Sequence, residues 1–597
     1  MNFQLSFEKL GVPLDKRQTI FRYDDTNPEA ESDEYIKSLR EDVDWLGWQP
    51  YKVTFTSDYF QILYEYAIQL IKANKAFVCY QTKAEIEACR DIAKARSAGK
   101  DVPGNPCSPW RDRPVEDNLK DFNDMKNGVF DSNKCTLRLK MDMESPNPNM
   151  WDQVAYRIKY IPHPHAGDGW CIYPTYDYTH CIIDSLEHID YSICTLEFET
   201  RRESYFWVLE ALGLYRPKVY EMSRLNISHT LLSKRKLLKL VESKFMRGWD
   251  DPRMPTIKGL RRRGYTKEII NEFCKDIGAT RTMNVVQIER LAAIARATLH
   301  EVSPRVMAVL NPLKVTIVNR TISQVSVPHY PFDPSRGCHS CSIEDVIYID
   351  RNDFRIDVED GYFGLAPKKV VNLKYAFPIM CESYEMNGDG EVVSLQCVAV
   401  REIESADAKP KTSIHWVSHS HSFKAEVREY NYLFTTEEPA DETWEKELNP
   451  NSEVVYTSAL LNSSILEWKL QKEMHFQFER VGFFVIDKES IIADDASKSK
   501  LVFNLTVNLK DSKPKAEVST GKNKSRKEEQ LKHLSEKMEK MKLNPVDMFR
   551  SQTDLYSQFD VDGLPTHDAD AKEISKSLSK KLKKEWEKQK KVFEANV

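Results

Sequence analysis

The chain has 597 residues, of which 41% are hydrophobic and 30% charged, and its formal net charge is −5. This length is too great for one hydrophobic core and indicates several domains. The sequence has no apolar run near the ~20 residues of a membrane-spanning helix, no secretory signal at its start, and twelve scattered cysteines. These features argue against a membrane protein or a disulfide-rich secreted domain, and they predict a cytoplasmic protein with reduced thiols.

The first 80 residues have the pattern of an α/β unit. The apolar, β-branched run Thr19–Tyr23 predicts a buried strand, which Asp24–Pro28 ends with loop residues. Apolar residues at helical spacing predict one helix after Ser32 and a second after Ser57, and Ala76–Tyr80 predicts the next strand. This alternation is typical of a parallel sheet covered by helices.

The following segments differ in pattern. Residues 81–169 are more polar and are interrupted by proline and glycine, which predicts a domain inserted into the α/β unit. The sheet pattern resumes at Trp170–Tyr173, so we expect the second part of the α/β domain over residues 170–240. We expect residues 241–304 to form a helical subdomain. Short runs of Val, Ile, Tyr and Thr over residues 305–508 predict one or two β-barrels.

The composition changes sharply after residue 508, where lysine, glutamate and serine dominate. Apolar residues at amphipathic spacing over residues 531–541, and again over residues 574–586, predict charged helices. We expect residues 509–597 to form a flexible, partly helical tail outside the folded body.

Three segments of the α/β part carry a family resemblance. They are Phe21–Pro28, Trp170–Cys181, and Ser223–Asn226 with the following Leu231–Lys236. In this order and spacing they resemble the glutamyl and glutaminyl branch of the class I aminoacyl-tRNA synthetases, and shorter motifs extend the resemblance over residues 20–508. The resemblance implies a Rossmann-like catalytic domain, an inserted domain that binds the acceptor stem, and anticodon-binding β-barrels.

Further motifs narrow the branch. Thr179–Cys181, Ile414–Val417 and Phe476–Arg480 resemble the glutaminyl members rather than the glutamyl ones. The implied activity is attachment of glutamine to its tRNA through glutaminyl-adenylate, with ATP as a substrate and Mg²⁺ as a cofactor. Two alternatives stay open: a glutamyl-tRNA synthetase, and a catalytically impaired tRNA-binding or assembly protein derived from this family.

The resemblance also implies roles for individual residues. Asp24 would hold the amino group of glutamine, although the same residue type at a strand end also caps turns. Tyr176 and His180 are four residues apart on one helical face and would read the side-chain amide; alternatively they pack in a core. Lys234, in a loop of the KMSKS type, would be catalytic by neutralising charge on the α-phosphate, although a bare basic run is usually an exposed turn. Further contacts to ATP would come from Arg224, Leu225, Ser233 and Arg235.

Four residues of the predicted barrels fall where the family reads anticodon bases. They are Arg305, Lys374, Gln477 and Arg480. Arginine and glutamine side chains can bond the edges of unstacked bases, although each alone could be an ordinary surface residue. Lys374 replaces an arginine expected from the family, and Gly364 stands where another arginine is expected, so the contacts to the anticodon would differ somewhat.

No metal site is predicted. Cys338 and Cys341 supply only two thiolates, whereas structural zinc usually takes four ligands. His163 and His165 are expected to be exposed loop histidines.

One family element is missing from the sequence. Family members begin with a strand, a Pro-Glu-Pro-Asn-Gly turn and a His-Ile-Gly-His helix start that forms one side of the ATP site, and neither string occurs in the chain. The chain is therefore expected to be either an incomplete version of an active enzyme or a protein that cannot form the adenylate but still binds tRNA or partners.

The tail resembles a different synthetase. Asn544–Arg550, Gly563–Asp568 and the lysine-rich end are similar to the C-terminal tail of eukaryotic cysteinyl-tRNA synthetases. This resemblance implies other synthetases as partners. The lysines within Lys580–Lys584 would add salt-dependent affinity for tRNA, or would simply form a solvated charged face.

Overall fold

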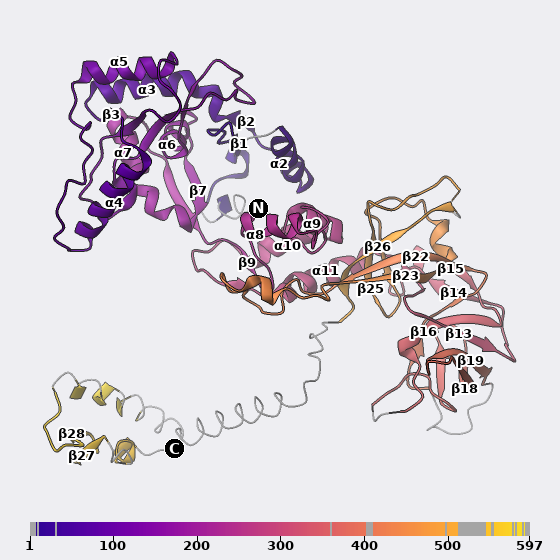
Figure 1. Ribbon diagram of the computed structural model, residues 1–597. Helices are drawn as coiled ribbons and strands as arrows, with labels where there is room; N and C mark the ends of the chain where they lie inside the picture. The colour runs from indigo at the N-terminus through magenta and orange to yellow at the C-terminus, as the bar shows by residue number, and fades with distance from the viewer. Residues whose placement is uncertain are drawn as a thin grey trace. The chain divides into compact units, whose positions relative to one another are not determined.

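The computed structural model describes residues 7–8, 11–29, 33–358, 361–400, 410–495, 498–510, 545–550, 555–575, 578–579, 582–584, 586–587 and 590 (Figure 1). The chain divides into two units, Met1–Asp511 and Ser512–Val597. The predicted helix over residues 531–541 lies outside the described residues. Within the described part of the chain, no helix combines the length and the apolar character needed to cross a membrane.

Two small parallel sheets form the α/β part of the first unit. In one, β1 (Ile20–Tyr23) pairs with β2 (Lys52–Phe55), and α2 (Asp33–Trp45) connects them. In the other, β7 (Tyr191–Thr195) pairs with β8 (Lys218–Met222). The predicted first strand and the helix that follows it are confirmed.

A four-stranded antiparallel sheet lies between these two in the sequence. Its order is β3-β4-β5-β6, and its bounds are β3 (Ala76–Cys79), β4 (Thr136–Leu139), β5 (Val154–Ile158) and β6 (Ile172–Pro174). The interpretation that β3 and β6 belong to the parallel sheet is wrong, because both pair with strands of the inserted segment. A short apolar run indicates that a strand is buried but does not specify its partner.

Helices cover this antiparallel sheet and join its core. The helices α3 (Phe60–Lys72), α5 (Val115–Lys126), α6 (Tyr176–Leu186) and α7 (Arg202–Leu212) contribute buried apolar side chains to one cluster with the sheet strands. Figure 1 shows α3 and α5 alongside one another, in agreement with their contacts. A further helix of the inserted segment is α4 (Lys83–Ser97).

A mainly helical region follows, as predicted. It contains α8 (Lys234–Glu242), α9 (Ile257–Arg263), α10 (Lys267–Ile277) and α11 (Ile288–Val302), together with the short parallel pair β9 (Asn226–Ile227) and β10 (Val285–Val286). Thr256 and Thr266 cap α9 and α10 by accepting a hydrogen bond from a first-turn backbone N–H.

Two seven-stranded sheets make up the all-β region, which confirms the predicted β-rich segment. Their orders are β11-β24-β25-β26-β22-β23-β12 and β20-β17-β18-β19-β13-β16-β21, and each has its own apolar core. The bounds, including the separate hairpin β14–β15, are β11 (Arg305–Val306), β12 (Ala308–Val309), β13 (Pro312–Ile317), β14 (Gln324–Pro328), β15 (Cys338–Ser342), β16 (Val346–Asp350), β17 (Val370–Leu373), β18 (Pro378–Met386), β19 (Val392–Ala399), β20 (Ser413–Ile414), β21 (Trp416–Ser418), β22 (Ser422–Tyr430), β23 (Glu453–Asn462), β24 (His475–Phe478), β25 (Gly482–Ile486) and β26 (Val502–Asn508).

The second unit contains an antiparallel hairpin that the sequence did not lead us to expect. Its strands are β27 (Tyr556–Phe559) and β28 (Pro565–Asp568). The Trp586 indole N–H donates to the Asp562 carbonyl at 3.1 Å, and Phe549 is buried. The described part of the tail is therefore not only helical.

Candidate active site

Two adjacent carboxylates, Asp24 and Asp25, directly follow strand β1 and have different surroundings. Asp25 is 1% exposed and accepts hydrogen bonds from the Ser57 backbone N–H at 3.0 Å and the Ser57 hydroxyl at 2.6 Å. These bonds fasten the end of β1 to the turn before α3. Asp24 accepts from the Thr56 hydroxyl at 3.3 Å and faces His180. Asp25 is thus a structural anchor, and Asp24 is available to a ligand.

The structure brings three predicted site residues together. The His180 Nδ1 lies 3.5 Å from Asp24 Oδ2, and its Nε2 lies 3.4 Å from Asp184 Oδ2. The Tyr176 and His180 rings stack with their centroids 5.0 Å apart and their planes at 21°. Both rings lie on the same face of α6, because residues four apart in a helix are neighbours. Asp24, Tyr176 and His180 therefore form one constellation.

The charges around His180 favour its protonated form. Burial disfavours a charged imidazole, but the carboxylates of Asp184 and Asp24 outweigh it and raise the pKa of His180. Burial acts against the Asp24 carboxylate too, yet the contacts with His180, with the Arg22 charge and with Thr56 lower the pKa of Asp24. Burial, helped by the charge of Asp24, raises the pKa of Tyr176, so its phenol stays protonated and can donate.

A buried ionic network supports the pocket from behind. The Arg22 guanidinium donates to Asp184 at 2.7 Å and to Glu187 at 3.0 Å, and the Tyr205 hydroxyl donates to Asp184 at 2.9 Å. The sequence analysis did not identify Arg22, Asp184 and Tyr205 as site residues. Asp184 could have been identified, because it follows His180 by four residues and therefore lies on the same face of the helix.

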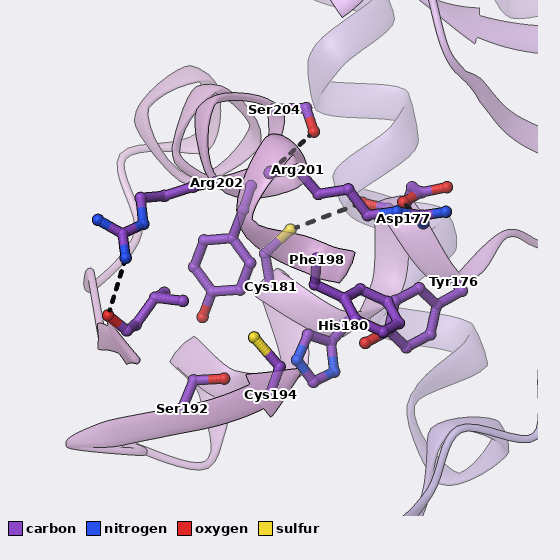
Figure 2. A pocket seen from close by; sticks show the side chains of 12 residues that line it. Tyr176, Asp177, His180, Cys181, Ser192, Cys194, Phe198, Arg201, Arg202 and Ser204 are labelled. Atoms are coloured by element: carbon purple, nitrogen blue, oxygen red, sulfur yellow. Dashed lines mark hydrogen bonds and ion pairs between the residues drawn. The ribbon is translucent and has the colours of Figure 1, made fainter. Parts of the chain in front are cut away.

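Tyr176 and His180 also line a pocket with about 450 Å³ of space not filled by protein, part of it open to solvent (Figure 2). Its lining comes from α6, β7, α7 and the segment between β7 and α7, with one residue of β8, and includes Tyr176, His180, Ser192, Cys194, Phe198, Arg201, Arg202, Tyr205 and Val219. Burial and the charge of Glu221 raise the pKa of Cys194 to about 11, so its thiol is neutral. The pocket wall therefore combines apolar surface with neutral hydroxyl and thiol groups and with the charged side chains of Asp177, Arg201 and Arg202.

The two arginines of this wall are already paired. Arg201 bonds to Asp177, and Arg202 donates to Glu221 at 3.0 Å. Their charges are thus balanced by carboxylates of the same chain.

The residues predicted to bind ATP lie on a separate part of the chain. Lys234 is the exposed first residue of α8, and its ammonium lies 5.0 Å from the ring centroid of Tyr35. Arg224 pairs with Glu197 at 2.6 Å. Among the residues that the structure describes, no hydrogen bond or ion pair joins Lys234 to Asp24, Tyr176 or His180. Ser233 precedes α8, Arg235 is exposed, and Leu225 packs against the core of the helical region.

Helix α8 is held by the long connection between β22 and β23. Leu237 and Leu240 pack with Phe434 and Trp444. The loop before α8 is held as well, because the His229 backbone N–H donates to the Glu437 carbonyl at 2.7 Å. The all-β region thus supports the segment that carries Lys234, which the sequence did not indicate.

Two of the residues predicted to read the anticodon, Arg305 and Gln477, lie on paired strands. Arg305 in β11 is the parallel partner of Gln477 in β24. The Arg305 guanidinium donates to the carbonyls of Ser303 at 2.8 Å and His300 at 2.9 Å. Gln477 is 8% exposed, and its buried Oε1 has no hydrogen-bond partner among the described residues. This oxygen can accept from a ligand.

The other two anticodon residues lie beside the same strand end. Lys374 pairs with Glu479 at 3.1 Å. Arg480 follows β24 with φ of 66° and donates to both carboxylate oxygens of Asp353, at 2.7 and 2.9 Å. Four residues scattered over the all-β region are thus linked through contacts around the end of β24.

One histidine prediction is wrong. His163 is buried, with its Nε2 2.7 Å from the Asp25 carbonyl and its Nδ1 accepting from the backbone N–H groups of His165 and Ala166. The imidazole satisfies the polar groups of its own loop, which an isolated sequence position does not show. His165 is exposed, as expected.

Comparison with known proteins agrees with this architecture. The family model of the catalytic domain of class I tRNA synthetases (E and Q) matches residues 15–301, and two models of the anti-codon binding domain of the same class match residues 303–400 and 413–487. The predicted order of a catalytic domain followed by all-β anticodon-binding domains is confirmed.

The curated relatives that match this chain and are described below are all named for the same activity. The glutamine–tRNA ligase of Lupinus luteus is 46% identical over 85% of this chain and 63% of its own length, and the cytoplasmic glutamine–tRNA ligase of Arabidopsis thaliana is 46% identical over 82% and 61%. The chain thus spans less than two thirds of these relatives. The glutamine–tRNA ligase of Haemophilus influenzae (strain 86-028NP) is 43% identical over 86% of this chain and 89% of its own length.

A solved glutamate–tRNA synthetase from Elizabethkingia anophelis covers 50% of this chain and 68% of its own, with 18% identity and a TM-score of 0.37, a likeness too low to support any argument. The family models and the curated relatives carry the assignment instead: the chain belongs to the glutaminyl branch of the class I tRNA synthetases.

Proposed function

We propose that this chain attaches glutamine to tRNA at the expense of ATP, through glutaminyl-adenylate. The observation that supports this most is that Tyr176 and His180 line one pocket and that Asp24 lies 3.5 Å from His180. In this proposal the Asp24 carboxylate binds the ammonium group of glutamine. The Tyr176 phenol and the His180 imidazole orient its side-chain amide.

The electrostatics of the pocket favour glutamine over glutamate. Asp24, Asp184 and Glu187 outnumber the cations Arg22 and protonated His180 in the network. A second carboxylate would meet this negative charge and find the arginines of the wall already paired. A neutral amide avoids that cost. The glutamyl alternative is less supported for this reason, and because the relatives named above are glutamine–tRNA ligases.

The nucleotide would bind toward α8. Lys234 would neutralise charge on the α-phosphate as pyrophosphate leaves, with Arg224, Leu225, Ser233 and Arg235 around the adenosine and phosphates. We keep Mg²⁺ as a proposed cofactor; the described residues contain no group of three or more His, Cys, Asp or Glu side chains suited to hold a metal ion.

The remaining parts have proposed roles in binding tRNA. Residues 81–169 would bind the acceptor stem, and Arg305, Lys374, Gln477 and Arg480 would read anticodon bases. We place the protein in the cytoplasm, and we keep other synthetases as proposed partners of the tail. Of the lysines within Lys580–Lys584, Lys583 and Lys584 belong to the described residues and are helical.

Glutamine-dependent exchange of pyrophosphate into ATP, measured with tRNA present, tests the proposal. The expected result is exchange with glutamine, none above background with glutamate, and a large loss in His180→Ala. Exchange with glutamate alone would support the glutamyl alternative. An absence of exchange, with tRNA binding intact, would overturn the proposed catalysis and favour a catalytically impaired tRNA-binding protein.

A further inference from the structure

An exposed aromatic ring stands beside the predicted anticodon residues. Phe332, in the loop between β14 and β15, is 43% exposed. The Arg305 guanidinium carbon lies 5.1 Å from its ring centroid, and the His300 ring lies 4.8 Å away at 31°. A single exposed apolar side chain is ordinary, but an exposed ring lined by a guanidinium and an imidazole is a less common arrangement.

The loop that carries Phe332 is fastened to the elements next to it. The Arg305 backbone N–H donates to the His329 carbonyl at 2.9 Å, and the Tyr330 hydroxyl donates to the Val302 carbonyl at 3.2 Å. Arg336 donates to the Glu301 carbonyl at 2.7 Å, and its guanidinium carbon lies 3.2 Å from the Tyr330 ring centroid. These bonds to the end of α11 and to β11 hold the loop in one position, so Phe332 is presented before any ligand arrives.

The contact between Arg305 and His300 sets the charge beneath this ring. The Arg305 Nη2 lies 2.8 Å from His300 Nδ1. A guanidinium can only donate, so Nδ1 accepts. The positive charge of Arg305 therefore lies beside the Phe332 ring.

A second observation points to a ligand at this place. Gln477 neighbours Arg305 across the parallel strand pair, and its Oε1 is buried without a partner among the described residues. A buried unsatisfied acceptor costs free energy unless something donates to it, and the N–H groups of a nucleobase edge are suitable donors.

We infer that Phe332 is a stacking platform for an unpaired nucleobase, adjacent to the base whose edge Gln477 reads. The inference rests on the proposed function, because it takes the anticodon loop of tRNA as the ligand. Proteins that bind single-stranded RNA combine an aromatic face with cationic groups, and the exposed Arg336 adds a charge that can attract the phosphate backbone. Phe332 accepts any base, whereas Gln477 selects one.

Binding of a synthetic anticodon stem-loop of a glutamine tRNA tests the inference. The fluorescent base 2-aminopurine is placed at each loop position in turn, because stacking quenches it. With the unmodified protein, quenching is expected at one unpaired position. Phe332→Ser is expected to abolish that quenching and to weaken binding by roughly tenfold or more. Phe332→Tyr keeps a ring and is expected to restore both.

Tyr215→Ser serves as the matched control, because Tyr215 is 44% exposed and belongs to no proposed RNA contact. It should bind like the unmodified protein, and circular dichroism melts should show that each variant is folded. Equal quenching and affinity in Phe332→Ser would overturn the stacking role and leave the proposed function untouched. If the unmodified protein binds no stem-loop, both the stacking role and the proposed reading of the anticodon are contradicted.

Discussion

Asp24, which directly follows β1, and His180, in the second turn of α6, lie 3.5 Å apart although the whole inserted segment separates them in the sequence. The contact couples the group proposed to bind the amino end of glutamine to the group proposed to orient its amide end. Asp184 Oδ2 lies 3.4 Å from the other ring nitrogen of His180. The imidazole therefore lies between two carboxylates.

The raised pKa of His180 predicts how stability depends on pH. The folded protein binds this proton more tightly than the unfolded chain does, so the stabilisation is full below the ordinary pKa of 6.5 and is lost as pH rises through the higher folded value. Urea unfolding of the unmodified protein and of His180→Gln at a series of pH values measures the effect. The slope of unfolding free energy against pH above 6.5 should be smaller in His180→Gln, and identical slopes would rule out a charged His180.

Substitutions of the two carboxylates that follow β1 should have different effects, one on glutamine binding and the other on stability. Asp24→Ala should raise the KM for glutamine in pyrophosphate exchange by roughly ten- to a hundredfold, because a charge-assisted bond to the ammonium group is lost. Asp25→Ala should instead lower the unfolding free energy by about 1–3 kcal/mol, since the buried Ser57 groups lose their acceptor. The reverse pattern, with Asp25→Ala impairing KM and Asp24→Ala impairing only stability, would contradict the assignment.

Removing Arg22 should damage the fold more than removing a partly exposed arginine does. Arg22→Met leaves Asp184 and Glu187 buried without their cation, and this should cost about 3–5 kcal/mol in urea unfolding. Arg40→Met is the control, because the Arg40 and Asp44 side chains are 35% and 40% exposed and the loss of their ion pair should cost less than about 1 kcal/mol. A similar small effect in both variants would show that the network does not stabilise the fold.

Gly364 should tolerate no side chain, although the family places an arginine near this position. A Cβ there would lie 2.8 Å from the Asp353 carbonyl and 2.2 Å from the Tyr362 hydroxyl. Gly364→Ala should therefore lower the unfolding free energy by about 1–3 kcal/mol. Gly388→Ala is the control in the same sheet region, since no atom lies within 4 Å of its Cβ. Equal midpoints of thermal unfolding in the two variants would contradict this.

The sequence predicted local structure better than strand pairing. The strand β1, the helices α2 and α3 and the β-rich region follow from residue patterns that act over a few positions. The antiparallel pairing of β3 with β4 depends on residues 136–139, far along the chain, and an apolar run cannot encode that choice.

The candidate site was predicted in part for a similar reason. Tyr176 and His180 share a helical face, so their proximity follows from spacing alone, and the motif resemblance added Asp24. The roles of Arg22 and Asp184 depend on tertiary contacts between β1 and α6 that no local pattern shows. The contact of Lys234 with Tyr35 depends on how α2 and α8 pack, and it is likewise invisible in the sequence.

Calorimetric binding of stable sulfamoyl analogues of the aminoacyl-adenylates shows whether one site recognises the amino acid and the nucleotide together. We expect tight binding of the glutaminyl analogue, much weaker binding of the glutamyl analogue, and a loss of both affinity and discrimination in the Asp24→Ala and His180→Gln variants. Equal binding of the two analogues, or glutaminyl binding that neither substitution weakens, would contradict this expectation.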